Sequence, residues 1–221
     1  MKKIKRTAIT EDLSDYVDRH RFDATDPLLD KLREETWAAY PDWAQMQIPG
    51  DQGAFLSSLV AGMQAKVVVE IGTFTGTSAI CIARALPADG HLYCFDLSDE
   101  FTSVARRYWK EAGLEDRITL RLGSAIELLG ELPDDPIDFA FLDADKTGYD
   151  AYFEALLPRM RTNGLMAFDN AFRSGRVLNP EDTDADSKAI HLLNKKLATD
   201  DRVQASLLTI GDGILLARKL P

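Results

Sequence analysis

The run Val67-Val68-Val69-Glu70-Ile71-Gly72-Thr73-Phe74-Thr75-Gly76 decides the fold. Its first five residues are apolar apart from Glu70, a pattern typical of a strand buried on both faces of a parallel sheet. Two glycines then provide a tight loop, and a helix-period segment follows at 77–86. The stretch predicts a strand, a loop and a helix, with backbone N–H groups offered to a ligand at the carboxyl end of the strand.

Strand-like and helix-period segments alternate along the rest of the chain. We expect further strands at 92–96, 118–122, 138–142 and 164–168, and helices at 99–112, 124–129, 149–157 and 186–198. This alternation is typical of a parallel sheet with crossover helices. Two last strand runs, 203–210 and 214–219, are joined by Gly211-Asp212-Gly213, which predicts an antiparallel hairpin. The chain is therefore expected to be α/β, with a seven-stranded, mostly parallel sheet and helices on both faces.

The length of the chain suits one domain. With 221 residues and 45% hydrophobic content it can bury one sizeable core, so we expect a single domain over 1–221. Residues 1–62 would form an N-terminal helical arm and lid, and 63–221 the core. Helices are expected at 26–40 and about 51–61, the first with Asp26 as its cap and Pro27 in its first turn.

The net charge and the cysteine content limit the binding partners and the cellular compartment that we expect. The formal net charge is -10 without a long single-sign block, which argues against nucleic acid and favours a small-molecule substrate. Cys81 and Cys94 lack metal-type spacing and are expected to be reduced, as in a cytoplasmic protein. The basic start at 1–6 is followed by Thr10-Glu11-Asp12 instead of an apolar stretch, so we expect neither export nor a membrane span.

Oxygen-bearing side chains follow two strands that are expected to be neighbours. Asp143 and Lys146 come after strand 138–142, and Asp169-Asn170 after strand 164–168. Carboxylates at the ends of adjacent strands would lie roughly 5 Å apart, a span that one cation can bridge. Oxygen donors suit Mg²⁺, Ca²⁺ or Mn²⁺ better than zinc. In an alternative interpretation, Asp143 and Asp145 cap the following helix, Lys146 is solvated, and Asp169-Asn170 forms an ordinary turn.

The loop after the first strand suggests a nucleoside ligand. Gly72 and Gly76 are spaced differently from the dinucleotide-binding G-x-G-x-x-G, and the preceding Glu70 would repel phosphate. Glu70 could instead hold a cationic group, directly or through Ser78, and Asp96 could accept both ribose hydroxyls. Glu70 as an ordinary loop acceptor and Asp96 as a helix cap remain open alternatives.

Together these motifs resemble the cation-dependent O-methyltransferase family, which includes catechol and caffeoyl-coenzyme A O-methyltransferases. The resemblance runs from about Met46 to the C-terminus. It is carried by Met46-Gln47-Ile48 with Gln52-Gly53, by Val69-Glu70-Ile71-Gly72 with Gly76 and Ser78, by Phe95-Asp96, Gly123-Ser124-Ala125, Leu142-Asp143-Ala144-Asp145-Lys146 and Asp169-Asn170. It implies a Rossmann-like class I methyltransferase fold, S-adenosylmethionine and a divalent cation, most often Mg²⁺, as cofactors, and a homodimer.

The resemblance also implies residue roles. Asp143, Asp169 and Asn170 would hold the metal, and Lys146 would be the catalytic proton acceptor beside Asp143. The cofactor would contact Met46, Ile48, Glu70, Gly72, Thr73, Gly76, Ser78, Asp96, Ala125 and Asp143. One position departs from the family, because Arg173 stands where relatives often carry a tryptophan near the acceptor.

The expected reaction is methyl transfer to one hydroxyl of a vicinal diol on a small aromatic molecule of the catechol type. Two other functions stay open: a nucleotide-dependent oxidoreductase on a similar sheet, and a non-catalytic module that binds a nucleoside or a metal. The spacing of Gly72 and Gly76 argues against the first, and the presence of Lys146 argues against the second.

Overall fold

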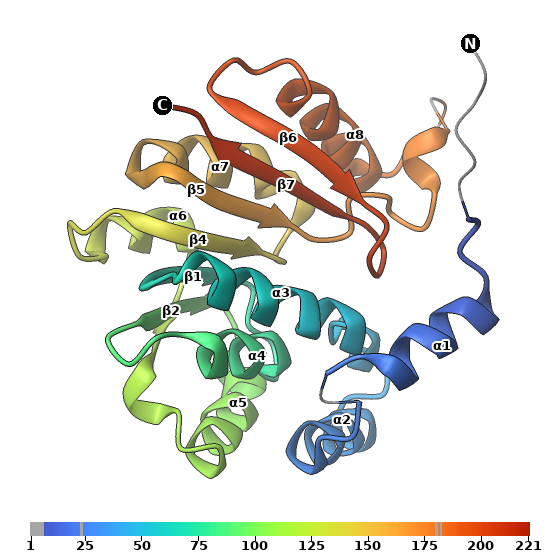
Figure 1. Cartoon of the computed structure of the whole chain (residues 1–221), viewed down its shortest axis with the longest axis vertical. Helices are drawn as coiled ribbons and strands as arrows, with labels where there is room; N and C mark the ends of the chain where they lie inside the picture. The colour runs from blue at the N-terminus through green and yellow to red at the C-terminus, as the bar shows by residue number, and fades with distance from the viewer. Residues whose placement is uncertain (1–6, 23, 180, 182) are drawn as a thin grey trace.

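The computed structural model describes residues 7–22, 24–179, 181 and 183–221, so the basic start at 1–6 lies outside it. A single sheet runs through the molecule in the order β3-β2-β1-β4-β5-β7-β6 (Figure 1). All neighbouring strands pair in parallel except β7, which is antiparallel to both β5 and β6. The predicted seven-stranded sheet and its C-terminal hairpin are confirmed. The strands are β1 (Val67–Ile71), β2 (His91–Asp96), β3 (Ile118–Leu122), β4 (Ile137–Leu142), β5 (Met160–Phe168), β6 (Val203–Leu208) and β7 (Ile214–Lys219).

Helices cover both faces of the sheet, as expected (Figure 1). One face is covered by α2 (Pro27–Ala39), α3 (Gly50–Met63), α4 (Thr77–Ala85) and α5 (Asp99–Glu111), and the other by α6 (Ala125–Leu128), α7 (Tyr149–Leu156) and α8 (Ala185–Leu197). Asp26 caps α2 as predicted, because its Oδ1 accepts hydrogen bonds from the backbone N–H groups of Leu28 and Leu29. In the part of the chain that the structure describes, no helix is both long and apolar enough to cross a membrane.

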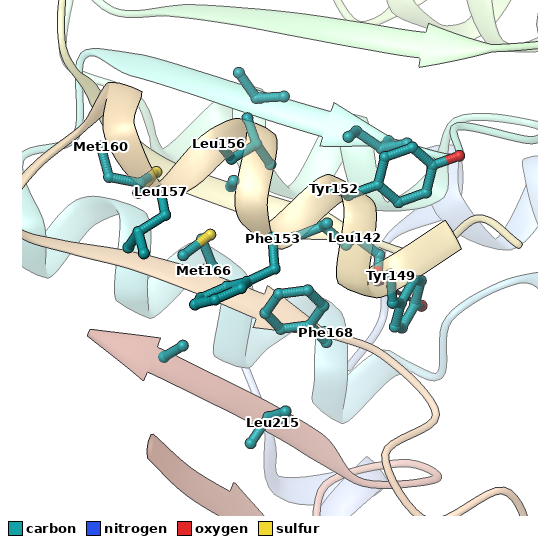
Figure 2. Close-up of a cluster of buried hydrophobic side chains, with 14 of the residues drawn as sticks. Leu142, Tyr149, Tyr152, Phe153, Leu156, Leu157, Met160, Met166, Phe168 and Leu215 are labelled. Atoms are coloured by element: carbon teal, nitrogen blue, oxygen red, sulfur yellow. Dashed lines mark hydrogen bonds between the residues drawn. The ribbon is translucent and has the colours of Figure 1, made fainter. Parts of the chain in front are cut away.

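The sheet separates two buried clusters. Val68 of β1 packs with α3, α4 and α5, whereas Val69 and Ile71 pack with α6, α7 and α8, because successive side chains of a strand point to opposite faces. Figure 2 shows the second cluster, in which Phe153 of α7 lies against Phe168 of β5, with ring centroids 6.5 Å apart. Truncating such a buried ring to alanine costs about 3–5 kcal/mol. This packing fixes β4 and β5 relative to α7, which begins just after Lys146.

Two elements differ from the prediction. The helix α1 (Glu11–His20) was not predicted; it is one of the shorter helices, and its few apolar residues, Leu13, Tyr16 and Val17, are not buried. Strand β5 begins at Met160 instead of 164, because its polar residues Arg161 to Asn163 lie before a shift in the register with β4 and give no strand pattern.

The strand order brings the predicted site residues to one edge of the sheet. From β1 the chain proceeds outward to β2 and β3, and then returns to β4 and β5 on the other side of β1. The loops that follow β1 and β4 therefore diverge, and ligands of open α/β sheets bind in the crevice formed at such a point.

Candidate active site

A cavity of about 1170 Å³ lies at the carboxyl ends of β1, β2, β4 and β5. Its volume exceeds that of a typical single-ligand pocket, so a cofactor and an acceptor could share it. The N-terminal segment from Asp42 to Gln52 forms one wall. Every residue predicted to bind cofactor or metal lines the cavity, with the exception of Glu70, and so does the predicted catalytic Lys146. The predicted residues in the lining are Met46, Ile48, Gly72, Thr73, Gly76, Ser78, Asp96, Ala125, Asp143, Lys146, Asp169 and Asn170.

The glycine loop after β1 depends on Gly72 for conformation and space. Gly72 has φ +90°, and a Cβ there would overlap the carbonyl oxygen of Asp143. Only glycine therefore lets this loop lie directly against the end of β4. Gly76, with φ +91°, is packed against α5, where a Cβ would come 2.7 Å from the Cβ of Ala105. The two glycines bring the loop, β4 and α5 together around the cavity.

Asp96 fixes the conformation of that loop. Its Oδ2 accepts hydrogen bonds from the backbone N–H groups of Thr73 at 2.9 Å and Phe74 at 2.8 Å, and its Oδ1 accepts from that of Ser98 at 2.8 Å. The N-cap of α5 is Ser98, whose Oγ accepts from the N–H of Phe101, so the interpretation of Asp96 as the helix cap is wrong. The Asp96 carboxylate faces the cavity with lone pairs left for ligand hydroxyls.

Glu70 lies behind the loop and is fully buried. Burial raises the pKa of Glu70 to about 7, against the opposing effect of the nearby Ser78 and Thr73 hydroxyls and the Cys94 thiol. Its Oε2 accepts from the Cys94 thiol at 3.3 Å, whereas Oε1 has no hydrogen-bond partner among the described residues. Because Ser78 and Thr73 line the cavity and Glu70 does not, the geometry favours an indirect contact of Glu70 with any ligand.

Lys146 is buried at the opposite end of the cavity. Its Nζ donates to Asp143 Oδ1 at 2.8 Å and to the Tyr149 hydroxyl at 2.9 Å. Tyr149 in turn donates to the carbonyl oxygen of Leu142 at 2.8 Å. Burial, together with the nearby Asp143 charge, raises the pKa of Tyr149, so its phenol stays protonated. With only 8% of Lys146 exposed, the interpretation of this residue as a solvated charge is wrong.

The two aspartates before α7 do not cap it. Asp145 Oδ1 accepts from the Tyr152 hydroxyl at 2.6 Å. The N-cap position of α7 is held by Gly148, without a side-chain hydrogen bond. The capping interpretation of Asp143 and Asp145 is therefore wrong, and Asp143 is left beside Lys146 at the cavity wall.

Asp169 and Asn170 complete the oxygen donors. Asp169 is 4% exposed, and its Oδ1 accepts from the backbone N–H of Asn170 at 2.7 Å. Burial and the negative charge of Asp143 raise the pKa of Asp169 well above its ordinary value, and the Lys146 charge only partly opposes this. Ionised carboxylates that repel each other next to an amide oxygen are suitable donors for a hard divalent cation.

The predicted metal ligands differ from a site built only from His, Cys, Asp or Glu side chains. Among the described residues, no group of three or more His, Cys, Asp or Glu side chains is arranged to hold a metal ion. The predicted set, Asp143, Asp169 and Asn170, contains two carboxylates and one amide, so it is not a group of that kind. The donor chemistry still fits Mg²⁺, which keeps several waters and uses few protein ligands.

Other residues at the cavity have no predicted role. Tyr149 was missed, although its spacing of three residues from Lys146 places the two on one side of the turn that starts α7. Gln52 belongs to the motif that carried the resemblance, and nothing in the sequence separates it from a surface glutamine. Phe74 and Phe101 form an aromatic wall near Asp96, with ring centroids 4.8 Å apart.

Arg173, the position that departs from the family, also lines the cavity. Its backbone has φ 47°, in the left-handed region, which orients the turn after Asn170. Its Nη2 donates to Asp186 Oδ2 at 2.8 Å, and Asp184 lies 3.6 Å away. The arginine charge is therefore largely compensated by acidic side chains at the start of α8.

Comparisons with known proteins show the family to which the chain belongs. Residues 19–220 match a protein family described as O-methyltransferase. The chain is 38% identical over 200 residues to a flavonoid 3',5'-methyltransferase of Vitis vinifera, and the match covers 86% of this chain and 85% of that protein. It is 36% identical over 202 residues to a caffeoyl-CoA O-methyltransferase of Populus kitakamiensis, covering 87% and 86%.

A solved structure gives the same result. The O-methyltransferase of Bacillus cereus, determined in complex with SAH, superimposes with a TM-score of 0.86 at 29% identity, covering 94% of this chain and 97% of that one. The Rossmann-like methyltransferase fold implied by the sequence resemblance is confirmed by this agreement. The chain belongs to the O-methyltransferase family.

Proposed function

We propose that this protein transfers the methyl group of S-adenosylmethionine to one hydroxyl of a vicinal diol on a small aromatic molecule, with a divalent cation bound at Asp143, Asp169 and Asn170. One observation carries the proposal: the glycine loop, Asp96, Lys146 and the oxygen donors of β4 and β5 all open into one cavity. The donor and the acceptor could therefore meet inside it, and holding two reactants in line can supply about 7–11 kcal/mol of the barrier.

The cofactor half of the cavity suits S-adenosylmethionine. The relative from Bacillus cereus was determined with SAH, the demethylated form of this cofactor. Asp96 offers carboxylate oxygens for the ribose hydroxyls, and Phe74 and Phe101 offer an aromatic wall for a base. Met46 and Ile48 would line the methionine end. Buried Glu70 would act on the cationic amino group through Ser78 and Thr73.

The acceptor half would prepare the hydroxyl for attack. When bound, a divalent cation would hold both hydroxyls of the diol and lower their pKa, which for a free phenol is near 10. Lys146 would take the proton, because its Nζ is fixed at the cavity wall by Asp143 and Tyr149. Tyr149, anchored on the Leu142 carbonyl, would keep the lysine facing the acceptor.

The charge of the cavity supports a small catechol instead of a coenzyme A thioester. Its two cationic side chains, Lys146 and Arg173, are both paired with carboxylates. They are outnumbered by the acidic residues of the lining, which are Asp42, Asp96, Asp143, Asp145, Asp169, Asp186 and Asp212. Anionic coenzyme A phosphates would be repelled, whereas a neutral or amine-bearing catechol would be accepted.

A methyl-transfer assay tests the proposal directly. Label from methyl-labelled S-adenosylmethionine should appear in catechols, disappear with EDTA and return when Mg²⁺ is added. Asp169→Ala should abolish this transfer and keep the cofactor affinity, because Asp169 lies at the acceptor end; exposed Asp116→Ala is the matched control. Transfer that persists in EDTA, or in Asp169→Ala at saturating acceptor, would exclude the assigned metal role.

A further inference from the structure

Gln52 is an isolated amide in the wall of the acceptor half of the cavity. It lies in the first turn of α3, is 1% exposed, and lines the same cavity as Asp169 and Asn170. The turn between β6 and β7 lies next to it, since a Cβ on Gly211 would come 2.6 Å from Gln52 Oε1. The side chain is thus enclosed between α3, the hairpin turn and the end of β5.

The amide of Gln52 has no hydrogen-bond partner in the described residues. Neither Nε2 nor Oε1 completes a hydrogen bond, although its backbone N–H donates to Asp51 Oδ1 at 2.8 Å. Each buried polar group left unpaired costs about 1–3 kcal/mol. An apolar side chain of similar length would avoid that cost, so the amide is expected to gain partners when the cavity is loaded.

Asp169, one of the proposed metal ligands, lies beside Gln52. Gln52 and Asp169 line the same cavity, and the Gln52 side chain approaches the Asp169 carboxyl without completing a hydrogen bond. One oxygen of that carboxylate, Oδ1, already accepts from the Asn170 N–H, whereas no described residue donates a complete hydrogen bond to Oδ2. Ligating carboxylates in metal sites are usually oriented by such outer hydrogen bonds.

We propose that Gln52 is a positioning residue of the metal site, whose Nε2 donates to the Asp169 carboxylate and holds it toward the cation. This inference rests on the proposed function, because it assigns Gln52 to the same cation. It also connects the two halves of the cavity, since α3 follows directly after Met46 and Ile48. Helix α3 would then align Met46 and Ile48, which we expect to contact the cofactor, with the metal ligand Asp169.

The test replaces the amide by an apolar chain of similar length and measures metal affinity without turnover. In Gln52→Met, Mn²⁺ affinity measured by calorimetry on the acceptor-free protein should fall about tenfold. S-adenosylmethionine affinity should change less than twofold. The unfolding midpoint of the metal-free protein should stay the same or rise, because an unpaired buried amide has been removed. Exposed Gln204→Met on β6 is the control and should change none of these values.

The outcomes separate this inference from the proposed function. If the native protein binds Mn²⁺ and Gln52→Met binds it equally well, only the role of Gln52 is wrong. A lower midpoint with unchanged Mn²⁺ affinity would show a purely structural residue and would also overturn the role. If the native protein and Asp169→Ala both fail to bind Mn²⁺, the metal site and the role of Gln52 fail together. Gln52→Ala is a second variant for the case that methionine does not fit, and it should show the same loss of Mn²⁺ affinity.

Discussion

At the scale of single residues, Lys146 and Tyr149 form a chain of hydrogen bonds at one end of the cavity, the end that we propose binds the acceptor. The lysine is held by an aspartate and a phenol, and the phenol by a backbone carbonyl. A flexible side chain with four rotatable bonds is thereby fixed at one point of the wall. Such fixation is what a general base requires, because it must lie within hydrogen-bond reach of the proton that it removes.

Replacing the lysine should give a loss of rate that depends on pH. Lys146→Ala should lower kcat about 10²–10⁴-fold at pH 7 and less at pH 9, because a phenol with a pKa near 10 ionises more by itself at the higher pH. Steady-state rates at both pH values measure this, with exposed Lys195→Ala as the control. An equal loss at both pH values would mean that the lysine only positions the acceptor.

Glu70 should make the cofactor-free protein less stable as the pH rises. Its folded pKa of about 7 lies above the ordinary value of 4.5 because burial disfavours the charge. The folded state therefore holds more protons than the unfolded state between these pH values, and stability falls as the pH rises through this window. Glu70→Gln should be neutral below pH 4.5 and stabilising above pH 7, by up to about 3 kcal/mol.

Urea unfolding of the cofactor-free protein at pH 5 and pH 8 measures this difference. The same variant should bind S-adenosylmethionine more weakly, since it lacks the carboxylate charge that we propose acts on the amino group through Ser78 and Thr73. If the difference in unfolding free energy between Glu70→Gln and the native chain were the same at both pH values, burial would not be the cause of the raised pKa. Exposed Glu127→Gln serves as the control.

The sequence was sufficient to predict those site residues whose positions depend only on the strands of the sheet. Asp96 ends β2, and Asp143 and Asp169 follow directly after β4 and β5, so the sheet brings all three together whatever the loops do. Gln52 and Tyr149 could not be predicted, because their positions depend on how α3 and α7 pack. Glu70 was correctly predicted in the first strand, but the strand pattern alone does not reveal that its carboxylate lies behind the residues that line the cavity.

At the scale of elements, α7, α8 and β6 are joined by a network of ion pairs. Glu154 of α7 accepts from Lys196 of α8 at 2.7 Å and from Arg202, next to β6, at 2.8 and 2.9 Å. Hydrogen bonding by Arg202, with Lys196, lowers the pKa of Glu154 to about 2. Because the Glu154 side chain is 43% exposed, solvent screens these pairs, and each is worth at most about 1 kcal/mol.

This network should be lost in acid. A carboxyl with a lowered folded pKa contributes stability above its ordinary pKa of 4.5, and the contribution disappears as the pH falls toward 2. Glu154→Gln should therefore lower the unfolding midpoint by a few degrees at pH 7, roughly 2–4 °C for a domain of this size. The difference from the native protein should shrink by pH 2.5. Thermal melts over this pH range check the trend, and a constant difference would contradict it.

Whole elements were predicted correctly where their buried residues form a recognisable apolar pattern in the sequence. Strands β1, β3 and β7 begin and end at the predicted residues, since each is an apolar run bounded by turns. The exposed helix α1 and the polar first part of β5 bury too little to leave such a pattern. Their formation depends on local capping and on pairing with β4, which periodicity does not report.

At the scale of the whole molecule, the order of the strands determines where chemistry can occur. The chain turns back after β3, so the loops after β1 and β4 separate and open the cavity at the sheet edge. The alternation of strands and helices was sufficient to predict this class of fold. The closure of the cavity by 42–52 required the three-dimensional packing of α3 and could not be read from periodicity.

We propose that the protein forms a homodimer through its N-terminal arm. Helix α1 has no buried residue, and its apolar Tyr16 and Val17 are 55% and 40% exposed. Light scattering after size exclusion should give twice the chain mass of 24.6 kDa. Removal of residues 1–22 should lower this mass toward one chain, and an unchanged dimer mass would place the interface elsewhere.

The central claim is that Asp143, Asp169 and Asn170 converge on one divalent cation. Anomalous diffraction from crystals soaked in Mn²⁺ and grown with S-adenosylhomocysteine tests it most directly. The account predicts a manganese peak within coordination distance, about 2.0–2.6 Å, of oxygens from all three side chains. An occupied adenosyl pocket without a manganese peak among these side chains would contradict it.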